Sequence, residues 1–367
     1  MTFLLRNILL DPRRSLQLDN VQLNQLISEA RSSRLLASLG IALQHVGVYE
    51  QISPNVQRHI RSAILIHEKQ KRDLAYDCGK IKLALDSVGE KLVLLKGAAY
   101  LIADLPTSSG RLITDIDIIV PHQRIEQAEK ALNKYGWESS HVSTYDDHYY
   151  RKWGHEIPPL TNRARETTLD VHHNILPPTA APSVNATLLF DNIVEVKPGL
   201  YTLSSHDMVI HSATHLFHEG EFHHGLRDLW DLDRMLRYFP LRDPDFWKVL
   251  VSRAMELELL GSLFHGLNYA QQVFSTPIPN DVMVQAGSWS MLLRKPIMDF
   301  LFLRAFRPDH PACALPLTGL ALNMLYVRSH FLRMPLYLLL PHLARKAWIK
   351  RFTDKSPMPG NQLPENI

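Results

Sequence analysis

Apolar residues recur at helical spacing through most of the first 88 residues. The segments "LNQLISEARSSRLLASLGIALQHV" and "NVQRHIRSAILIHEKQKRDLAYDCGKIKLALDSVG" place apolar side chains three and four positions apart, with few helix breakers. This spacing predicts an all-helical N-terminal region over residues 1–88.

The pattern changes after Gly89, where short apolar runs replace the helical spacing. We expect strands at "EKLVLLKG", "RLITDIDIIVP", "WESSHV" and "ETTLDVHHNI". Between the first two, "AAYLIADL" predicts a helix and "PTSSG" a turn, and "HQRIEQAEKALNKYG" predicts an amphipathic helix capped by Gly136. The polar stretch that follows, to about residue 165, predicts no element. A small mixed β-sheet over residues 89–200 is therefore expected.

Helical spacing returns after the proline-rich "LPPTAAPS". It runs from Ser204 to near Phe352, which predicts a C-terminal helical domain over residues 201–352, and the tail at 353–367 has the composition of a disordered segment. The expected fold class is α+β, with a small mixed β-sheet core between two helical regions.

Charge and cysteine content exclude some classes of protein. The net charge of +3 does not indicate a general nucleic-acid binder. Cys78 and Cys313 lie too far apart for a CxxC pair, which fits a reducing compartment and argues against structural zinc. The N-terminal "MTFLLRNILLDPRRS" lacks the long apolar region of a signal peptide, so a cytoplasmic protein is expected.

The segment "FLRMPLYLLLPHLARKAWIKRF" (331–352) combines apolar and basic residues. Pro335 and Pro341 interrupt it before it reaches bilayer-spanning length, so no integral membrane association is expected. The favoured interpretation is a terminal helix packed on the domain, and contact with a membrane surface is the alternative.

Two aspartates interrupt the apolar run "DIDIIV". Side chains alternate in a strand, so Asp115 and Asp117 share one face while Ile116 and Ile118 face the core. Carboxylates on one face repel unless a cation or a proton intervenes, and Mg²⁺ prefers such oxygen ligands. Asp170, in the strand "TTLDVHHN", is the candidate third acid of a two-metal site. The alternative is that Asp115 and Asp117 cap the strand in water.

Residues upstream of the aspartates favour phosphate binding. Lys96 and Gly97 lie between the first strand and a helix, where free backbone amides attract anions, and glycine permits a close approach. Arg111 offers a guanidinium fork for a phosphate. Each residue alone is usually structural, whereas their order, strand, Lys-Gly, helix, turn, Arg, strand, Asp-x-Asp, is far more specific.

Residues 92–176 resemble the signature of the DNA polymerase β-like nucleotidyltransferase superfamily, in its bacterial branch with a "KG…R…DIDI(L/I)V" core and a following "(L/I)(D/E)(V/L)H" strand. The resemblance implies that Gly97 belongs to the turn that holds the nucleoside triphosphate. It also implies that Asp115, Asp117 and Asp170 bind two Mg²⁺ ions, with Mn²⁺ as an alternative, and that His172 is the histidine of the branch pattern. The chain has Gly97-Ala98 where the common form has Gly-Gly or Gly-Ser.

Polar residues downstream allow two interpretations each. His211, His215 and His218 fall on one helical face and predict either a metal site or, as the favoured interpretation, a half-buried helix against the sheet. Arg227, with Asp228 and Asp231, predicts a structural ion-pair cluster, with contact to a substrate phosphate as the alternative. The lone His155 is expected to be an ordinary, partly exposed residue.

The resemblance implies an ATP-binding or other NTP-binding transferase that moves a nucleoside monophosphate to an acceptor and releases pyrophosphate. The acceptor stays open among small molecules, peptides, proteins and RNA, as do the nucleobase and the oligomeric state. The alternative is a binding module of the same fold that has lost turnover.

Overall fold

The computed structural model of the chain describes residues 3–139 and 151–334. Its helices are α1 (Leu4–Leu10), α2 (Asn20–Ser32), α3 (Leu36–His45), α4 (Pro54–Asp86), α5 (Lys96–Ile102), α6 (Ile125–Lys134), α8 (Thr187–Phe190), α9 (Ser205–His218), α10 (Gly225–Tyr238), α11 (Phe246–Glu256), α12 (Leu260–Phe274), α13 (Asn280–Ala286), α14 (Trp289–Ala305) and α15 (Thr318–Arg333). Its strands are β1 (Leu92–Leu94), β2 (Asp115–Ile119), β3 (Trp137–Ser139), β4 (Leu160–Asn162), β5 (Thr168–His172), β6 (Val194–Lys197) and β7 (Leu200–Thr202).

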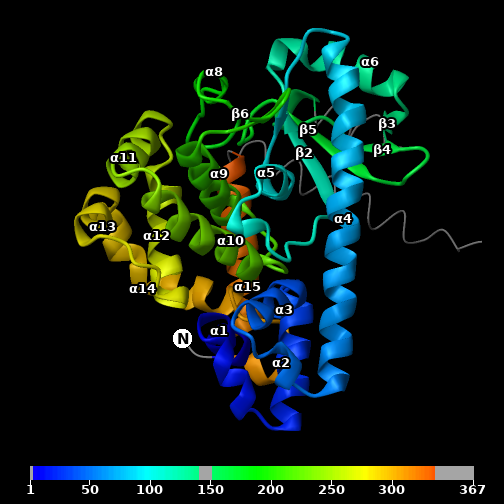
Figure 1. The fold of residues 1–367 in the computed structure, drawn as a ribbon. Helices are drawn as coiled ribbons and strands as arrows, with labels where there is room; N and C mark the ends of the chain where they lie inside the picture. Colours follow the sequence, from blue (N-terminus) through cyan, green and yellow to red (C-terminus); the bar gives the residue numbers. More distant parts are fainter. Residues whose placement is uncertain (1–2, 140–150, 335–367) are drawn as a thin grey trace, which may run out of the picture.

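The N-terminal region is helical, as its spacing predicts. Helices α2 and α3 pack against the lower part of the long helix α4, and α1 packs on α2 and α3. Helix α4 continues upward to the sheet (Figure 1). One face of α4 buries Val56, Ile60 and Ala63 near the N-terminal helices, and the other end buries Ile81 and Leu85 near β1. The length of α4 thus joins the helical region to the sheet.

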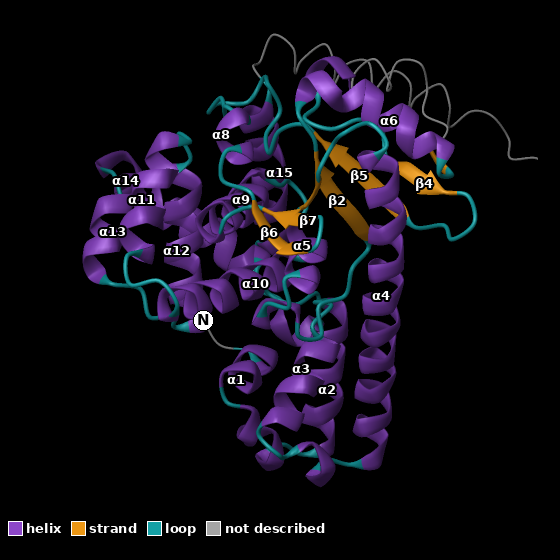
Figure 2. Cartoon of the chain, turned by 45° about the horizontal axis from the view of Figure 1, so that its top comes forward, coloured by secondary structure: helices purple, strands orange, loops and turns teal. Residues whose placement is uncertain are grey.

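The strands form one seven-stranded mixed sheet in the order β3-β4-β5-β2-β1-β7-β6 (Figure 2). Strand β2 pairs in parallel with β5 and antiparallel with β1, and β1 pairs in parallel with β7. The expected α+β class is confirmed. Strands β4, β6 and β7 were not predicted, because each has only three or four residues and too little alternation to be distinguished from a loop.

Helices α9 to α15 make up the remainder of the described chain, as predicted from Ser204 onward. One buried apolar cluster runs from Phe3 to Leu325, so the sheet and both helical regions share a core. The boundaries at residues 88, 200 and 352 stay a prediction, and the expected disordered tail lies outside the described residues. No helix in the described ranges is both long and apolar enough to cross a bilayer.

Candidate active site

The register of β2 against β5 brings the three predicted acids together. Asp117 is the direct partner of Asp170 across the parallel pair, and Asp115 is the partner of Thr168. Neighbouring strands lie about 4.8 Å apart and partners point to the same face, so Asp115, Asp117 and Asp170 share one face of the sheet. Ile116 and Ile118 are buried on the opposite face, as predicted.

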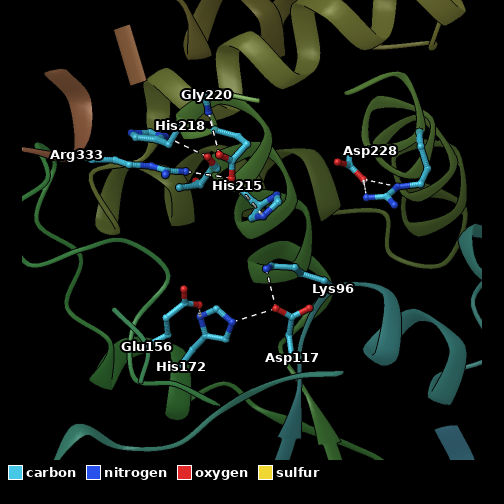
Figure 3. A network of polar contacts seen from close by, with 12 residues as sticks. Lys96, Asp117, Glu156, His172, His215, His218, Gly220, Asp228 and Arg333 are labelled. Atoms are coloured by element: carbon cyan, nitrogen blue, oxygen red, sulfur yellow. Dashed lines mark hydrogen bonds and ion pairs between the residues drawn. The ribbon is translucent and has the colours of Figure 1, made fainter. Parts of the chain in front are cut away.

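Asp117 is the most strongly paired of the three acids. Its Oδ1 accepts hydrogen bonds from Lys96 Nζ at 2.7 Å and from His172 Nε2 at 3.0 Å (Figure 3). Burial works to raise the pKa of Asp117, but Lys96 and His172 outweigh it, and the pKa lies well below its ordinary value. Burial likewise opposes the charge of Lys96, and Asp117 outweighs it, so the pKa of the ammonium is raised.

For Asp115 and Asp170 the nearby cations do not offset burial and the neighbouring carboxylates. Asp115 accepts one hydrogen bond, from the Thr114 hydroxyl at 3.1 Å, and burial together with Asp117 raises its pKa. Burial, followed by Asp117, raises the pKa of Asp170 to about 7. Asp170 Oδ1 is buried and has no hydrogen-bond partner in the described part of the chain. These two carboxylates therefore lie where a cation would be strongly stabilised.

The acids fit magnesium by donor type, since all three offer carboxylate oxygens and Asp170 Oδ1 is buried with no hydrogen-bond partner among the described residues. They do not form a single tight cage. Two groups of three potential ligands in the described ranges have donor atoms within 4.8 Å of one another, and the aspartates are not among them. Wider spacing suits two ions, which lie about 3.5–4 Å apart in two-metal sites, so that the outer ligands bind different ions.

Replacing Asp170 with asparagine is expected to remove a pH dependence of stability. The folded pKa of about 7 exceeds the ordinary aspartate pKa of 3.8, so the native state binds a proton that the unfolded chain releases. The contribution of Asp170 to the wild-type free energy of unfolding should therefore fall as pH rises from about 4 to 7, by roughly 1.4 kcal/mol per pKa unit at most, and the difference between wild type and the variant isolates it. Urea unfolding at pH 5 and pH 8 without divalent ions measures this.

The Asp170→Asn variant should lack that decrease and be the more stable protein at pH 8. A matched control is Asp191→Asn, which removes an exposed aspartate just after α8 and should behave as wild type at both pH values. Identical pH dependence of wild type and Asp170→Asn would contradict the placement of this carboxyl.

A cavity of about 430 Å³ opens beside Asp115 and Asp117, and Asp170 is not among the residues that line it. The sheet side contributes Lys96, Gly97, Arg111, Asp115 and Asp117 to its wall. The opposite wall comes from α9, α10 and the loop between them: Ser212, His215, Glu219, Glu221, His223, His224, Arg227, Asp228 and Asp231. The C-terminal helices thus close a site whose acids come from the sheet.

A family model described as "Uncharacterised nucleotidyltransferase" matches residues 19–275, which is more than half of the chain and includes the sheet, the three acids and the opposite wall of the cavity. The chain belongs to this nucleotidyltransferase family. A search of curated proteins and a search of solved structures each found no significant match. Membership supports a transferase that uses a nucleotide substrate.

Arg111 of this nucleotidyltransferase is bound by the C-terminal helices. Its Nε donates to Asp231 Oδ2 at 2.6 Å and its Nη1 donates to the Leu112 carbonyl at 2.7 Å, while Nη2 lies 3.5 Å from Asp228. Burial opposes the charge of Arg111, but Asp231 and Asp228 outweigh it, so its pKa is raised. The guanidinium faces the cavity with its donors engaged, and its predicted contact with a phosphate stays a prediction.

Some of the polar residues on α9 and α10 have structural contacts, and others border the cavity. Arg227 donates to Asp228 at 2.8 Å, as the structural interpretation predicts, and it also borders the cavity. His215 borders the cavity, whereas His218 Nδ1 lies 3.1 Å from the Thr214 carbonyl on its own helix. Burial lowers the pKa values of all three predicted histidines, His211 included. Within the described ranges these histidines do not form one of the ligand groups, so a structural helix is favoured over a metal site. The expectation of a half-buried helix against the sheet is wrong in its packing, because α9 is buried on nearly all sides among α10, α11, α12 and α15.

Sequence reasoning missed Glu156. Its Oε2 lies 3.2 Å from His172 Nδ1, so His172 lies between the carboxylates of Glu156 and Asp117 (Figure 3). His155, Glu156 and His172 form one of the groups with donor atoms within 4.8 Å, and burial lowers the pKa of His155. A single β-bridge pairs Glu156 with His172, a contact that no local periodicity indicates.

Replacing Gly97 with alanine is expected to weaken nucleotide binding without loss of stability. A Cβ at Gly97 would lie 3.7 Å from the Arg111 guanidinium, which is ordinary contact, and alanine in a helix is favoured by about 0.5–1 kcal/mol. The methyl group would instead hold off a phosphate that approaches this backbone, and the affinity should fall about tenfold, or 1.4 kcal/mol.

Calorimetric titration with a non-hydrolysable triphosphate analogue measures the affinity of Gly97→Ala. The matched control is Gly79→Ala on α4, where an added Cβ meets nothing within 4 Å. Equal affinities of the two variants would contradict a role for Gly97 in nucleotide binding.

Proposed function

We propose that this protein is a Mg²⁺-dependent nucleotidyltransferase that transfers a nucleoside monophosphate from a nucleoside triphosphate to an acceptor. The observation that carries the proposal is the register that sets Asp117 beside Asp170, with Asp115 on the same face and a cavity lined by Asp115 and Asp117. Family membership supports the reaction class. The order Lys96-Gly97, Arg111, Asp115-x-Asp117 and Asp170-x-His172 supports the finer assignment to the DNA polymerase β-like superfamily.

In the proposed reaction an acceptor oxygen forms a bond to the α-phosphorus while the bond from that phosphorus to the β-phosphate oxygen breaks. Pyrophosphate leaves, and the acceptor loses one proton. Asp170, the third acid of the site, is the group to which we assign this proton, since its Oδ1 has no hydrogen-bond partner among the described residues.

The remaining residues are assigned by charge and position. Asp115, Asp117 and Asp170 would hold magnesium, which when bound supplies Lewis-acid stabilisation of phosphoryl oxygens. Lys96 offsets the charge of Asp117 and lies on the cavity wall, so it is placed to attract a triphosphate. His172, fixed by Glu156, orients the Asp117 carboxylate through its hydrogen bond to Oδ1.

The test is incubation of the full chain with each of the four α-labelled triphosphates, magnesium and a cell extract. Label should pass to an acceptor fraction, and pyrophosphate should be released in equal amount only when magnesium is present. The Asp117→Asn variant should do neither. Nucleotide binding with no pyrophosphate release from any of the four triphosphates would favour the binding-module alternative.

A further inference from the structure

A second group of metal-binding side chains, which includes none of the active-site residues, lies between α2 and the segment that joins α14 to α15. Glu29 of α2, His310 and Cys313 have donor atoms that all lie within 4.8 Å of one another. His310 precedes the 3₁₀ turn Pro311–Cys313 and Cys313 ends it, and side chains three positions apart eclipse in such a turn. Carboxylate, imidazole and thiolate are the side-chain donors that zinc uses in proteins.

Glu29 is a buried carboxylate whose described hydrogen bonds all come from neutral groups. Glu29 and Cys313 are both 0% exposed. Oε2 of Glu29 accepts from Leu5 N at 2.8 Å and Oε1 accepts from Gln25 Nε2 at 2.7 Å. The Cys313 thiol donates to the same carboxylate, and burial, followed by Glu29, raises the pKa of this thiol to about 12 although Arg307 lowers it in part. A buried carboxylate is costly without a bound cation, and a metal ion between it and the thiol would remove that cost.

The hydrogen bonds of these side chains are compatible with metal binding. A carboxylate oxygen that accepts one hydrogen bond keeps a second lone pair, and ligating carboxylates are usually held by such bonds, here from Leu5 and Gln25. His310 Nδ1 accepts from Ala312 N at 3.2 Å. Ala312 is exposed, so water can replace this acceptor when the imidazole binds a metal. The three side chains can therefore become ligands without a change of fold.

We propose that Glu29, His310 and Cys313 together bind one Zn²⁺ ion, whose fourth position opens toward a cavity of about 340 Å³ that His310 and Cys313 help to line. The thiolate selects zinc over Mg²⁺ and Ca²⁺, which prefer oxygen ligands alone. On binding, the Cys313 sulfur bonds to zinc, its proton passes to solvent, and no group is oxidised or reduced. The sequence argued against structural zinc because its two cysteines lie far apart, whereas the fold surrounds one of them with ligands of other types.

Titration of the metal-free full chain with zinc, in competition with a chromophoric chelator, tests the proposal. Millimolar magnesium is present throughout, so that the proposed active-site ligands are occupied. Wild type should bind zinc, and cobalt in its place should give the near-ultraviolet absorption of a thiolate bound to the metal. The Cys313→Ser variant should lack this absorption and bind zinc about a hundredfold more weakly, because the thiolate is lost. The Glu29→Gln variant should keep the absorption and bind roughly tenfold more weakly.

The matched control is Cys78→Ser, which changes the other buried cysteine, on α4, and should bind zinc and cobalt as wild type does. Circular dichroism checks that each variant is folded, and the cobalt spectrum of wild type decides the matter even if Cys313→Ser is not. A wild-type cobalt complex without the thiolate absorption would overturn the proposal. Equal zinc affinity of wild type and folded Cys313→Ser would also overturn it, and would place the ion elsewhere, such as at His155, Glu156 and His172. The titration requires no catalysis, so its outcome is independent of the proposed transfer reaction.

Discussion

Replacing Asp115 with asparagine should abolish nucleotidyl transfer and leave the protein at least as stable as wild type. The carboxylate has one described hydrogen bond, from Thr114, and its pKa is raised by burial and by Asp117, so its charge is unfavourable in the folded state. Removing that charge relieves repulsion in the absence of metal. The same change removes a proposed magnesium ligand, and the rate should fall about a thousandfold or more.

The measurement pairs the rate of pyrophosphate release at saturating magnesium and triphosphate with thermal unfolding of the metal-free protein. The control is Asp104→Asn, which removes an exposed acid near α5 that pairs with Lys197 at 2.8 Å. Asparagine also tolerates the positive φ of 50° at this position. The control should keep full activity. Substantial transfer by Asp115→Asn would exclude the proposed role of Asp115.

The sequence predicted the part of the site that local patterns encode. Asp115 and Asp117 interrupt an apolar strand, Asp170 and His172 alternate in another, and both strands form where predicted. The prediction also had to assume that these two strands pair with each other. Their parallel pairing is what makes Asp117 and Asp170 direct neighbours. A carboxylate in a β-branched run is visible in sequence because it conflicts with the hydrophobic pattern.

The opposite wall of the cavity was beyond sequence reasoning, because it depends on packing between distant segments. Arg111 donates to Asp231, which lies 120 positions later, and β1 pairs with β7 more than 100 residues away. The sequence predicted that Arg111 binds a phosphate, and it predicted Asp231 in a separate helical segment with no contact to Arg111. Glu156 lies where no element was predicted, and its partner His172 is fixed only by the folded sheet.

Replacing Asp117 with asparagine should abolish transfer and also destabilise the fold, because Asp117 pairs with Lys96. The sequence alone predicts only the first, since it gives no partner for Asp117. In the structure the carboxylate is almost fully buried and Lys96 is 22% exposed, so the variant leaves an ammonium without its counter-charge. Loss of one partner of such a pair costs about 3 kcal/mol. The asparagine oxygen can still accept from His172, which isolates the effect of Lys96.

The decisive comparison is the double variant Lys96→Met/Asp117→Asn. It removes both charges, so urea unfolding should show that most of the lost free energy of unfolding is regained, while transfer stays abolished because the metal ligand is still missing. Lys96→Met alone should also be destabilising, since it leaves the buried Asp117 carboxylate without its strongest partner. If Asp117→Asn is as stable as wild type, or if the double variant is no more stable than Asp117→Asn, then Lys96 does not depend on Asp117 for its charge compensation. An inactive, destabilised single variant beside an inactive, stable double variant would separate the structural role of Asp117 from its catalytic one.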